Sequence, residues 1–110
     1  MVKNTKKDST LLSDYINIIY FITPLLKKVS KIKDSNLIYE TNLSLNFGLK
    51  YLMYAIQENN KAKKIKYLNN FIFNLDILKN LLNIAHNCNY ISDYESKKYN
   101  KLFKQIELEI

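Results

Sequence analysis

Apolar residues recur along this chain at alternating steps of three and four residues, and this periodicity restricts the possible folds more than any other feature. That spacing places the side chains on one face of an α-helix that packs against a partner at a shallow angle. Pro24 interrupts the first run and predicts a kink there. The run starts after ten polar residues, in which Asp8 or Ser9 is a candidate helix cap, and contains Leu11, Tyr15, Ile18, Ile22, Leu25 and Val29.

Three further stretches carry the same pattern. The second helix is expected from a cap at Asp34 or Ser35 to about Glu58, after a connection over residues 27–35. The third is expected from about Ala62 to Cys88, closed by Asn87-Cys88-Asn89 because Asn tolerates the left-handed conformation. The fourth follows a capping box, Ser92-Asp93-Tyr94-Glu95. The residues expected on the inward faces are, for the second helix, Ile38, Thr41, Leu45, Gly48, Leu52 and Ala55; for the third, Ile65, Leu68, Ile72, Leu75, Leu78, Leu82 and Ala85; and for the fourth, Tyr99, Leu102, Phe103, Ile106 and Ile110.

Four amphipathic helices of similar expected length with short joints predict an all-α fold, an antiparallel up-down-up-down four-helix bundle. The 110 residues fit one domain, with a flexible basic N-terminus over residues 1–9 and the bundle over residues 10–110. Small residues alternate with large ones on the second helix, so Gly48 is expected where another backbone comes close. Apolar side chains outside the inward faces predict an oligomeric interface; they are Phe21, Leu37, Leu49, Ile56, Phe71, Phe73, Ile77, Leu81 and Ile84.

The sequence shows none of the residue patterns typical of a catalytic or metal site. The single histidine and the single cysteine, His86 and Cys88, are two residues apart and therefore point to different faces of a helix. Carboxylates are scattered, and no glycine-rich phosphate loop is present. We therefore predict a non-enzyme with no metal and no cofactor. No apolar run approaches the roughly 20 residues of a membrane span, and no signal peptide is recognisable, so a cytoplasmic location without membrane contact is expected.

Charge is the remaining functional signal. All 17 basic residues are lysines, against 10 acidic residues, which gives a net charge of +7. Antiparallel threading brings the first and third connections to one end of the bundle, where tyrosines (Tyr39, Tyr90 and Tyr94) are available to stack on bases. Without arginine, contact is expected with the phosphate backbone of DNA or RNA rather than with base edges. The candidate residues are Lys27, Lys28, Lys31, Lys33, Lys97 and Lys98, with Lys79 part way along the third helix.

Two alternatives stay open. In the first, the lysines form a solvated face, since a chain rich in Lys, Asn, Ile and Tyr is also expected from an AT-rich genome. The other end of the bundle carries lysines as well, but Glu107 and Glu109 are expected to dilute them; these lysines are Lys61, Lys63, Lys64 and Lys66.

The order of four stretches resembles a bacterial four-helix-bundle family that includes the accessory variability determinant (Avd) of diversity-generating retroelements and the proteins encoded in intervening sequences of large-subunit ribosomal RNA genes. The stretches are the proline-leucine turn over residues 22–29, the basic connection after it, the segment 78–86 ending in Ala85-His86, and the tyrosine-led turn over residues 90–95 with Tyr99. The chain departs from the family at Val29-Ser30, Glu40 and Asn83, and lacks its glycine- and tryptophan-containing ending.

The resemblance implies a non-catalytic homopentamer that binds DNA or RNA and a partner reverse transcriptase, which it assists in mutagenic copying. Lys31 and Lys79 correspond to basic positions of the family. The alternative implied by the same resemblance is an intervening-sequence-type bundle that acts as a protein-interaction or structural module without binding nucleic acid.

Overall fold

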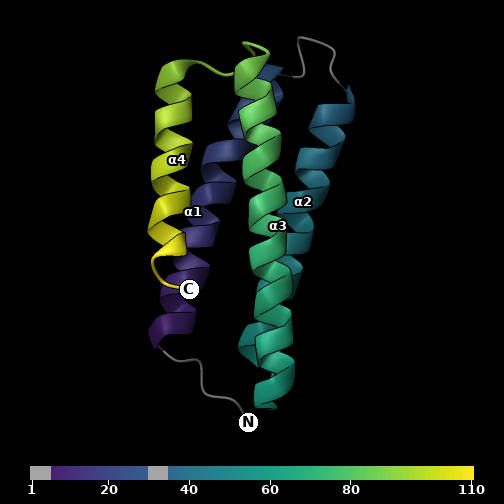
Figure 1. The fold of residues 1–110 in the computed structure, drawn as a ribbon, viewed down its shortest axis with the longest axis vertical. Helices are drawn as coiled ribbons and strands as arrows, with labels where there is room; N and C mark the ends of the chain where they lie inside the picture. Colours follow the sequence, from purple (N-terminus) through teal and green to yellow (C-terminus); the bar gives the residue numbers. More distant parts are fainter. Residues whose placement is uncertain (1–5, 30–34) are drawn as a thin grey trace.

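Four α-helices lie side by side along the long axis of the molecule (Figure 1), whose principal extents are 46 × 23 × 17 Å. The structure, a computed structural model, describes residues 6–29 and 35–110. Within these ranges there is no strand, which confirms the predicted all-α class and is consistent with a four-helix bundle. The helices are α1 (Lys6–Val29), α2 (Ser35–Gln57), α3 (Lys61–Asn87) and α4 (Asp93–Glu107).

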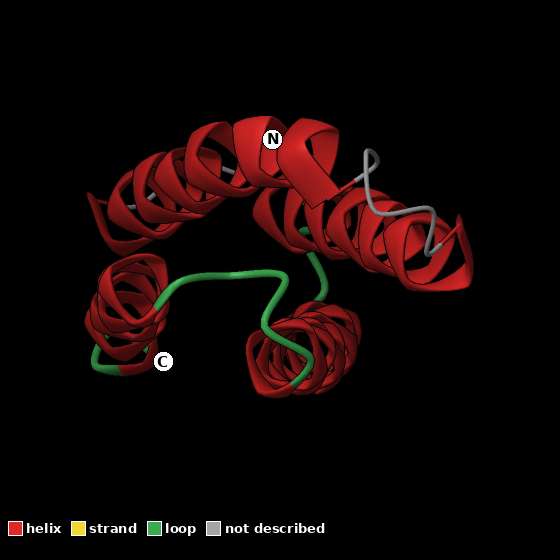
Figure 2. Ribbon diagram, turned by 90° about the horizontal axis from the view of Figure 1, so that it is seen from above, coloured by secondary structure: helices red, strands yellow, loops and turns green. Residues whose placement is uncertain are grey.

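The helices form two layers, with α1 beside α2 and α3 beside α4 (Figure 2). The most extensive packing joins α2 to α3 across the layers, and α1 also packs against α4. We call the end where α1 and α3 begin the lower end, and the end where α1 and α3 finish and α4 begins the upper end (Figure 1). The turn over residues 58–60 lies at the lower end and the turn over residues 88–92 at the upper end.

The start of α1 differs from the expectation based on the polar N-terminal residues. The helix begins at Lys6, not at about Leu11. Asp8 is buried there, and its carboxylate accepts a hydrogen bond from Lys64 Nζ at 2.9 Å. The expected first connection is also too long, because Lys27, Lys28 and Val29 belong to the last turn of α1, which continues through Pro24.

Capping contacts confirm the predicted start and stop of α3 and the predicted start of α4, whereas α4 ends at Glu107 and leaves Ile110, expected on the inward face, 43% exposed. The side chain of Asn60 accepts from the backbone N–H of Lys63, which starts α3. Asn89 adopts the left-handed conformation after α3, with φ at 63°. Both hydrogen bonds of the capping box between Ser92 and Glu95 are present at the start of α4.

The core follows the predicted stripes except at a few positions of α2 and α3. On α3 the buried stripe starts at Phe71, which is fully buried, whereas the sequence placed Phe71 outside the inward face. Its ring meets that of Tyr15 edge to face at 5.1 Å. Leu37 and Ile56 on α2 are likewise buried although they were expected outside the seam. Ile65, which was expected inward, is 49% exposed.

Gly48 lies where α2 meets α1, and its close neighbour is a side chain rather than a backbone. Tyr15 Oη occupies the space that a Cβ at position 48 would need. The hydroxyl donates a hydrogen bond to the carbonyl of Leu45 at 2.7 Å. Gly48 therefore allows a buried tyrosine to find a backbone acceptor on the facing helix.

The expectation of equal helix lengths is wrong for α4. It has 15 residues, whereas α1, α2 and α3 have 24, 23 and 27. Its last turn ends well above the start of α3 (Figure 1). The upper part of the molecule is thus built from four helices, and the lower part from α1, α2 and α3.

By length and composition, α1 is able to cross a membrane, contrary to the expectation that no apolar run approaches that length. Its mean hydropathy is 1.2 over an 18-residue window. In this structure 33% of that window is buried in the bundle, and a helix packed in a core passes the same test of length and composition.

Candidate nucleic-acid interface

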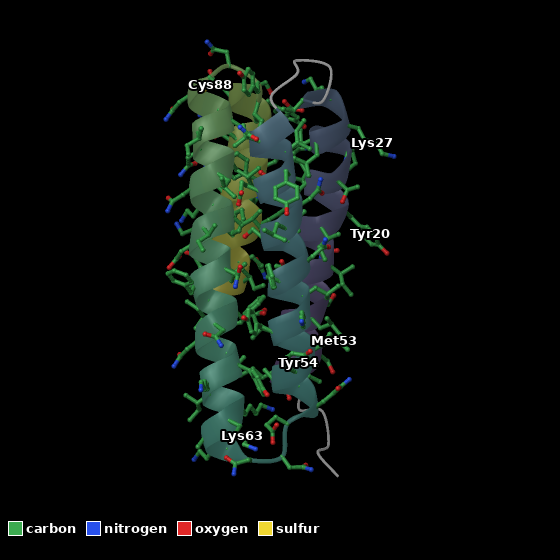
Figure 3. The ribbon with its side chains drawn as sticks, turned by 90° about the vertical axis from the view of Figure 1, so that its right-hand side faces the viewer. Tyr20, Lys27, Met53, Tyr54, Lys63 and Cys88 are labelled. Carbon is green, nitrogen blue, oxygen red and sulfur yellow. The ribbon has the colours of Figure 1, made fainter. Side chains whose placement is uncertain are left out.

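The upper end gathers lysines from two helices. Lys27 and Lys28 lie in the last turn of α1, and Lys97 and Lys98 lie in the second turn of α4. All four side chains are exposed. Figure 3 shows Lys27 and Cys88 near this end of the molecule and Lys63 near the other. The structure therefore brings together four of the seven candidate residues; Lys31 and Lys33 lie outside the described residues.

Lys28 is partly neutralised by the helix that packs against it. Its ammonium nitrogen lies 3.2 Å and 3.3 Å from the two carboxylate oxygens of Glu95. Burial alone would raise the pKa of Glu95, but hydrogen bonds from Ser92 and from Lys28 lower that pKa overall. The same carboxylate thus caps α4 and holds α1 beside it.

An aromatic side chain accompanies the lysines, as the sequence suggested. Tyr94 is 67% exposed, and Lys98 Nζ lies 4.7 Å from the centre of its ring. Tyr39 on α2 is also exposed, whereas Tyr90 is half-buried. An exposed ring beside an ammonium group combines a surface on which a base can stack with a positive charge that can contact a phosphate.

Lys79 does not join this group. It lies eight residues before the end of α3, about 12 Å along the helix axis, and its Nζ is 3.3 Å from Glu107 Oε1 at the end of α4. Its charge therefore faces a carboxylate on the neighbouring helix, and the structure separates it from the lysines of the upper end.

Besides the Lys28–Glu95 ion pair, a second contact at this end was missed by sequence reasoning. His86 Nε2 lies 2.7 Å from Asp93 Oδ1 across the turn between α3 and α4. The seven-residue separation spans two helices, so no helical spacing rule could indicate it. Cys88 is exposed at the C-cap of α3. Among the residues that the structure describes, no three potential metal ligands come together.

A shallow groove of about 350 Å³ opens between α1 and α4 beside the Lys28–Glu95 ion pair. Phe21, Pro24 and Leu25 form its apolar wall, and Tyr20, which is 72% exposed, stands at its edge. The upper end therefore offers both charge and apolar surface.

Comparison of the chain with protein-family models, with curated proteins and with solved structures found no match. The class that the fold and this end define is an all-helical, four-helix protein with a lysine-rich, tyrosine-bearing end.

Proposed function

We propose that this chain is a non-catalytic accessory protein that binds the phosphate backbone of DNA or RNA at its upper end and assists a partner reverse transcriptase, as the resemblance to the Avd family implies. The observation that carries the proposal is the exposure of Lys27 on α1 and of Lys97 and Lys98 on α4 at the same end of the molecule, with the exposed ring of Tyr94 beside Lys98. In this proposal the helices follow an up-down-up-down order, the assembly is a homopentamer and the location is cytoplasmic.

Salt dependence of binding tests the proposal directly. Binding of a labelled duplex DNA and a structured RNA is measured between about 50 and 200 mM salt, where each phosphate neutralised contributes about −0.9 to the slope of log K against log salt on B-DNA. We expect a slope of several units for the wild-type protein. A flat response, or no binding at the lowest salt, contradicts nucleic-acid binding.

Charge reversal locates the surface. The double variant Lys97→Glu/Lys98→Glu is expected to weaken binding of all sequences alike and to flatten the slope by about two phosphate contacts. The matched control is Lys50→Glu/Lys104→Glu, which changes the net charge equally at exposed positions away from the upper end. Equal losses in the two double variants would show a general effect of net charge rather than a site.

A second function is favoured by a separate observation, an apolar groove between α2 and α3. Phe47, Tyr51, Phe73 and Ile77 line it over about 320 Å³, and the rings of Phe47 and Tyr51 stack at 6.3 Å. In this alternative the chain is a protein-interaction or structural module of the intervening-sequence type, and the lysines serve solubility.

Light scattering, which measures the oligomeric state, tests part of both proposed functions. A protein that uses this groove for self-association is expected to lose its oligomeric state on Phe73→Asp, because that side chain is 64% exposed and contributes little to the monomer core. A wild-type monomer at micromolar concentration would contradict the homopentamer in both readings.

A further inference from the structure

The short α4 leaves an apolar groove open at the lower end, between the first turns of α1 and α3. The groove encloses about 300 Å³, and its apolar floor consists of Leu11, Ile65 and Leu68. Higher up, α4 packs against these same two helices, α1 and α3. A helix continuing the line of α4 would therefore lie in this groove and cover the exposed face of Ile65.

Lysines surround the groove. Lys7, Lys61 and Lys64 line it, and Lys6, Lys63 and Lys66 are exposed in the same helical turns. The described acidic residues of this end are fewer: Asp8, which pairs with Lys64; Glu58, which accepts from the backbone N–H of Asn60; Glu109, which lines a pocket with Lys6 and Lys7; and Asp14, which lies beside Glu109.

The expected dilution by Glu107 and Glu109 is partial. Glu107 lies against Lys79 on α3. Glu109 lies beside Asp14 on α1 and lines a pocket with Lys6 and Lys7. The six lysines of the lower end outnumber its four described carboxylates, so this end keeps an excess of positive charge.

This charge is unfavourable for the fold itself. The N-terminus of a helix carries a partial positive charge, so lysines there are repelled. No acidic residue stands in the first turn of α3, where Lys61 and Lys63 lie. Among the described residues, no ion pair joins Lys61 or Lys63 to a carboxylate, so the charge of these two lysines favours an anionic partner.

We propose that the lower end is a docking site for an acidic amphipathic helix of a partner protein, which inserts apolar side chains over Leu11, Ile65 and Leu68 while its carboxylates face Lys7 and Lys61. Charge complementarity selects this occupant. A second copy of the same end would bring lysines against lysines. The proposal does not depend on the nucleic-acid-binding function of the upper end.

The probe is a fluorescein-labelled peptide of about 18 residues, or five helical turns, with leucines every third or fourth position and glutamates at most others. A second peptide has the leucines replaced by alanine at unchanged charge, and a single-stranded DNA of equal charge is the third probe. Fluorescence polarisation at about physiological salt is expected to show the leucine peptide binding at least tenfold tighter than the other two.

Matched variants locate the binding. Ile65→Ser is expected to weaken the leucine peptide about fivefold or more, because it removes part of the apolar floor. Ile84→Ser is its control on the same helix, since Ile65 and Ile84 are 49% and 50% exposed. Lys7→Glu/Lys61→Glu is expected to weaken binding about tenfold or more, whereas Lys97→Glu/Lys98→Glu at the upper end is not.

Three results would overturn the proposal. The first is the absence of peptide binding by the wild-type protein. The second is equal binding of the leucine and alanine peptides or of the DNA, which would make the lower end a general polyanion surface. The third is an equal effect of Ile65→Ser and Ile84→Ser. Circular dichroism of each variant checks that the helices remain folded.

Discussion

Tyr15 on α1 and Gly48 on α2 pack as a pair, because the buried hydroxyl of Tyr15 occupies the space that a Cβ at position 48 would need. The ring of Tyr15 is almost fully buried and contacts Phe71, while its hydroxyl reaches the backbone of α2 over Gly48. A phenol in this position satisfies its hydrogen bond only if the facing residue has no Cβ. The glycine is therefore a packing residue rather than a flexible point.

Replacing Gly48 by alanine tests this coupling. Alanine raises helix propensity by about 1 kcal/mol, but the new Cβ displaces Tyr15 Oη from a full core, which costs more. We expect Gly48→Ala to lower the free energy of unfolding by about 1–3 kcal/mol in urea denaturation. Asn46→Ala, at an exposed position of the same helix, is the control and is expected to be neutral or slightly stabilising. A stabilised Gly48→Ala variant would contradict the contact.

The buried hydroxyl of Tyr15 also makes the folded state less stable as the pH becomes alkaline. Burial raises the pKa of Tyr15 well above its ordinary value near 10. The unfolded chain therefore releases the phenolic proton first, and the stabilisation of the folded state is lost as pH rises above about 10. We expect the decline of melting temperature between about pH 9 and 11 to be shallower in Tyr15→Phe than in the wild-type protein. Tyr20→Phe, at an exposed site, should leave the decline unchanged.

At the level of helices, local signals located ends that are made by local contacts. Ser92 and Glu95 close their capping box within one turn, and Asn89 ends α3 in the left-handed conformation. The start of α1 was missed because it depends on Asp8 meeting Lys64, which is 56 residues away. No pattern within one helix contains that information.

The same limit explains the register of α3 and the candidate site. The buried positions of α3 are 71, 75, 78, 82 and 85, so that Phe71 takes the place expected for Ile72; Ile65, where the expected stripe began, is exposed because α4 does not extend over it. Topology alone placed Lys27, Lys28, Lys97 and Lys98 at one end, where the structure has them, whereas Lys79 lies apart from them. Their neutralisation was not predictable, because Lys28 meets Glu95 across 67 residues and Lys79 meets Glu107 across 28.

The capping box has a measurable role because α4 is the shortest helix. Helices of its length are marginal without caps and tertiary packing. We expect Ser92→Ala to lower the free energy of unfolding by about 1 kcal/mol and to speed hydrogen exchange first in α4. Ser13→Ala, at an exposed position within α1, controls for loss of a serine hydroxyl. Unchanged exchange in α4 would show that packing alone fixes the start of this helix.

At the scale of the whole molecule, the two lysine-rich ends differ in whether the lysines stabilise the helices that carry them. At the upper end, Lys27 and Lys28 stand at the C-terminus of α1, where a helix favours positive charge, and Glu95 meets Lys28. At the lower end, Lys61 and Lys63 stand at the N-terminus of α3, where positive charge is disfavoured. Helix stability by itself explains lysines at the end of a helix, whereas it does not explain lysines at the start of one.

This difference gives a prediction with opposite signs for one chemical change. Lys63→Glu removes a repelled charge from the start of α3, and Lys104→Glu removes a favourable one from the last turn of α4. Both variants lower the net charge equally. In urea denaturation at low ionic strength, we expect Lys63→Glu to raise and Lys104→Glu to lower the free energy of unfolding, each by about 0.3–1 kcal/mol, and both effects to shrink in high salt. Equal shifts in the two variants would mean that net charge alone governs stability, and the unfavourable placement of lysines at the lower end would no longer favour an acidic partner there.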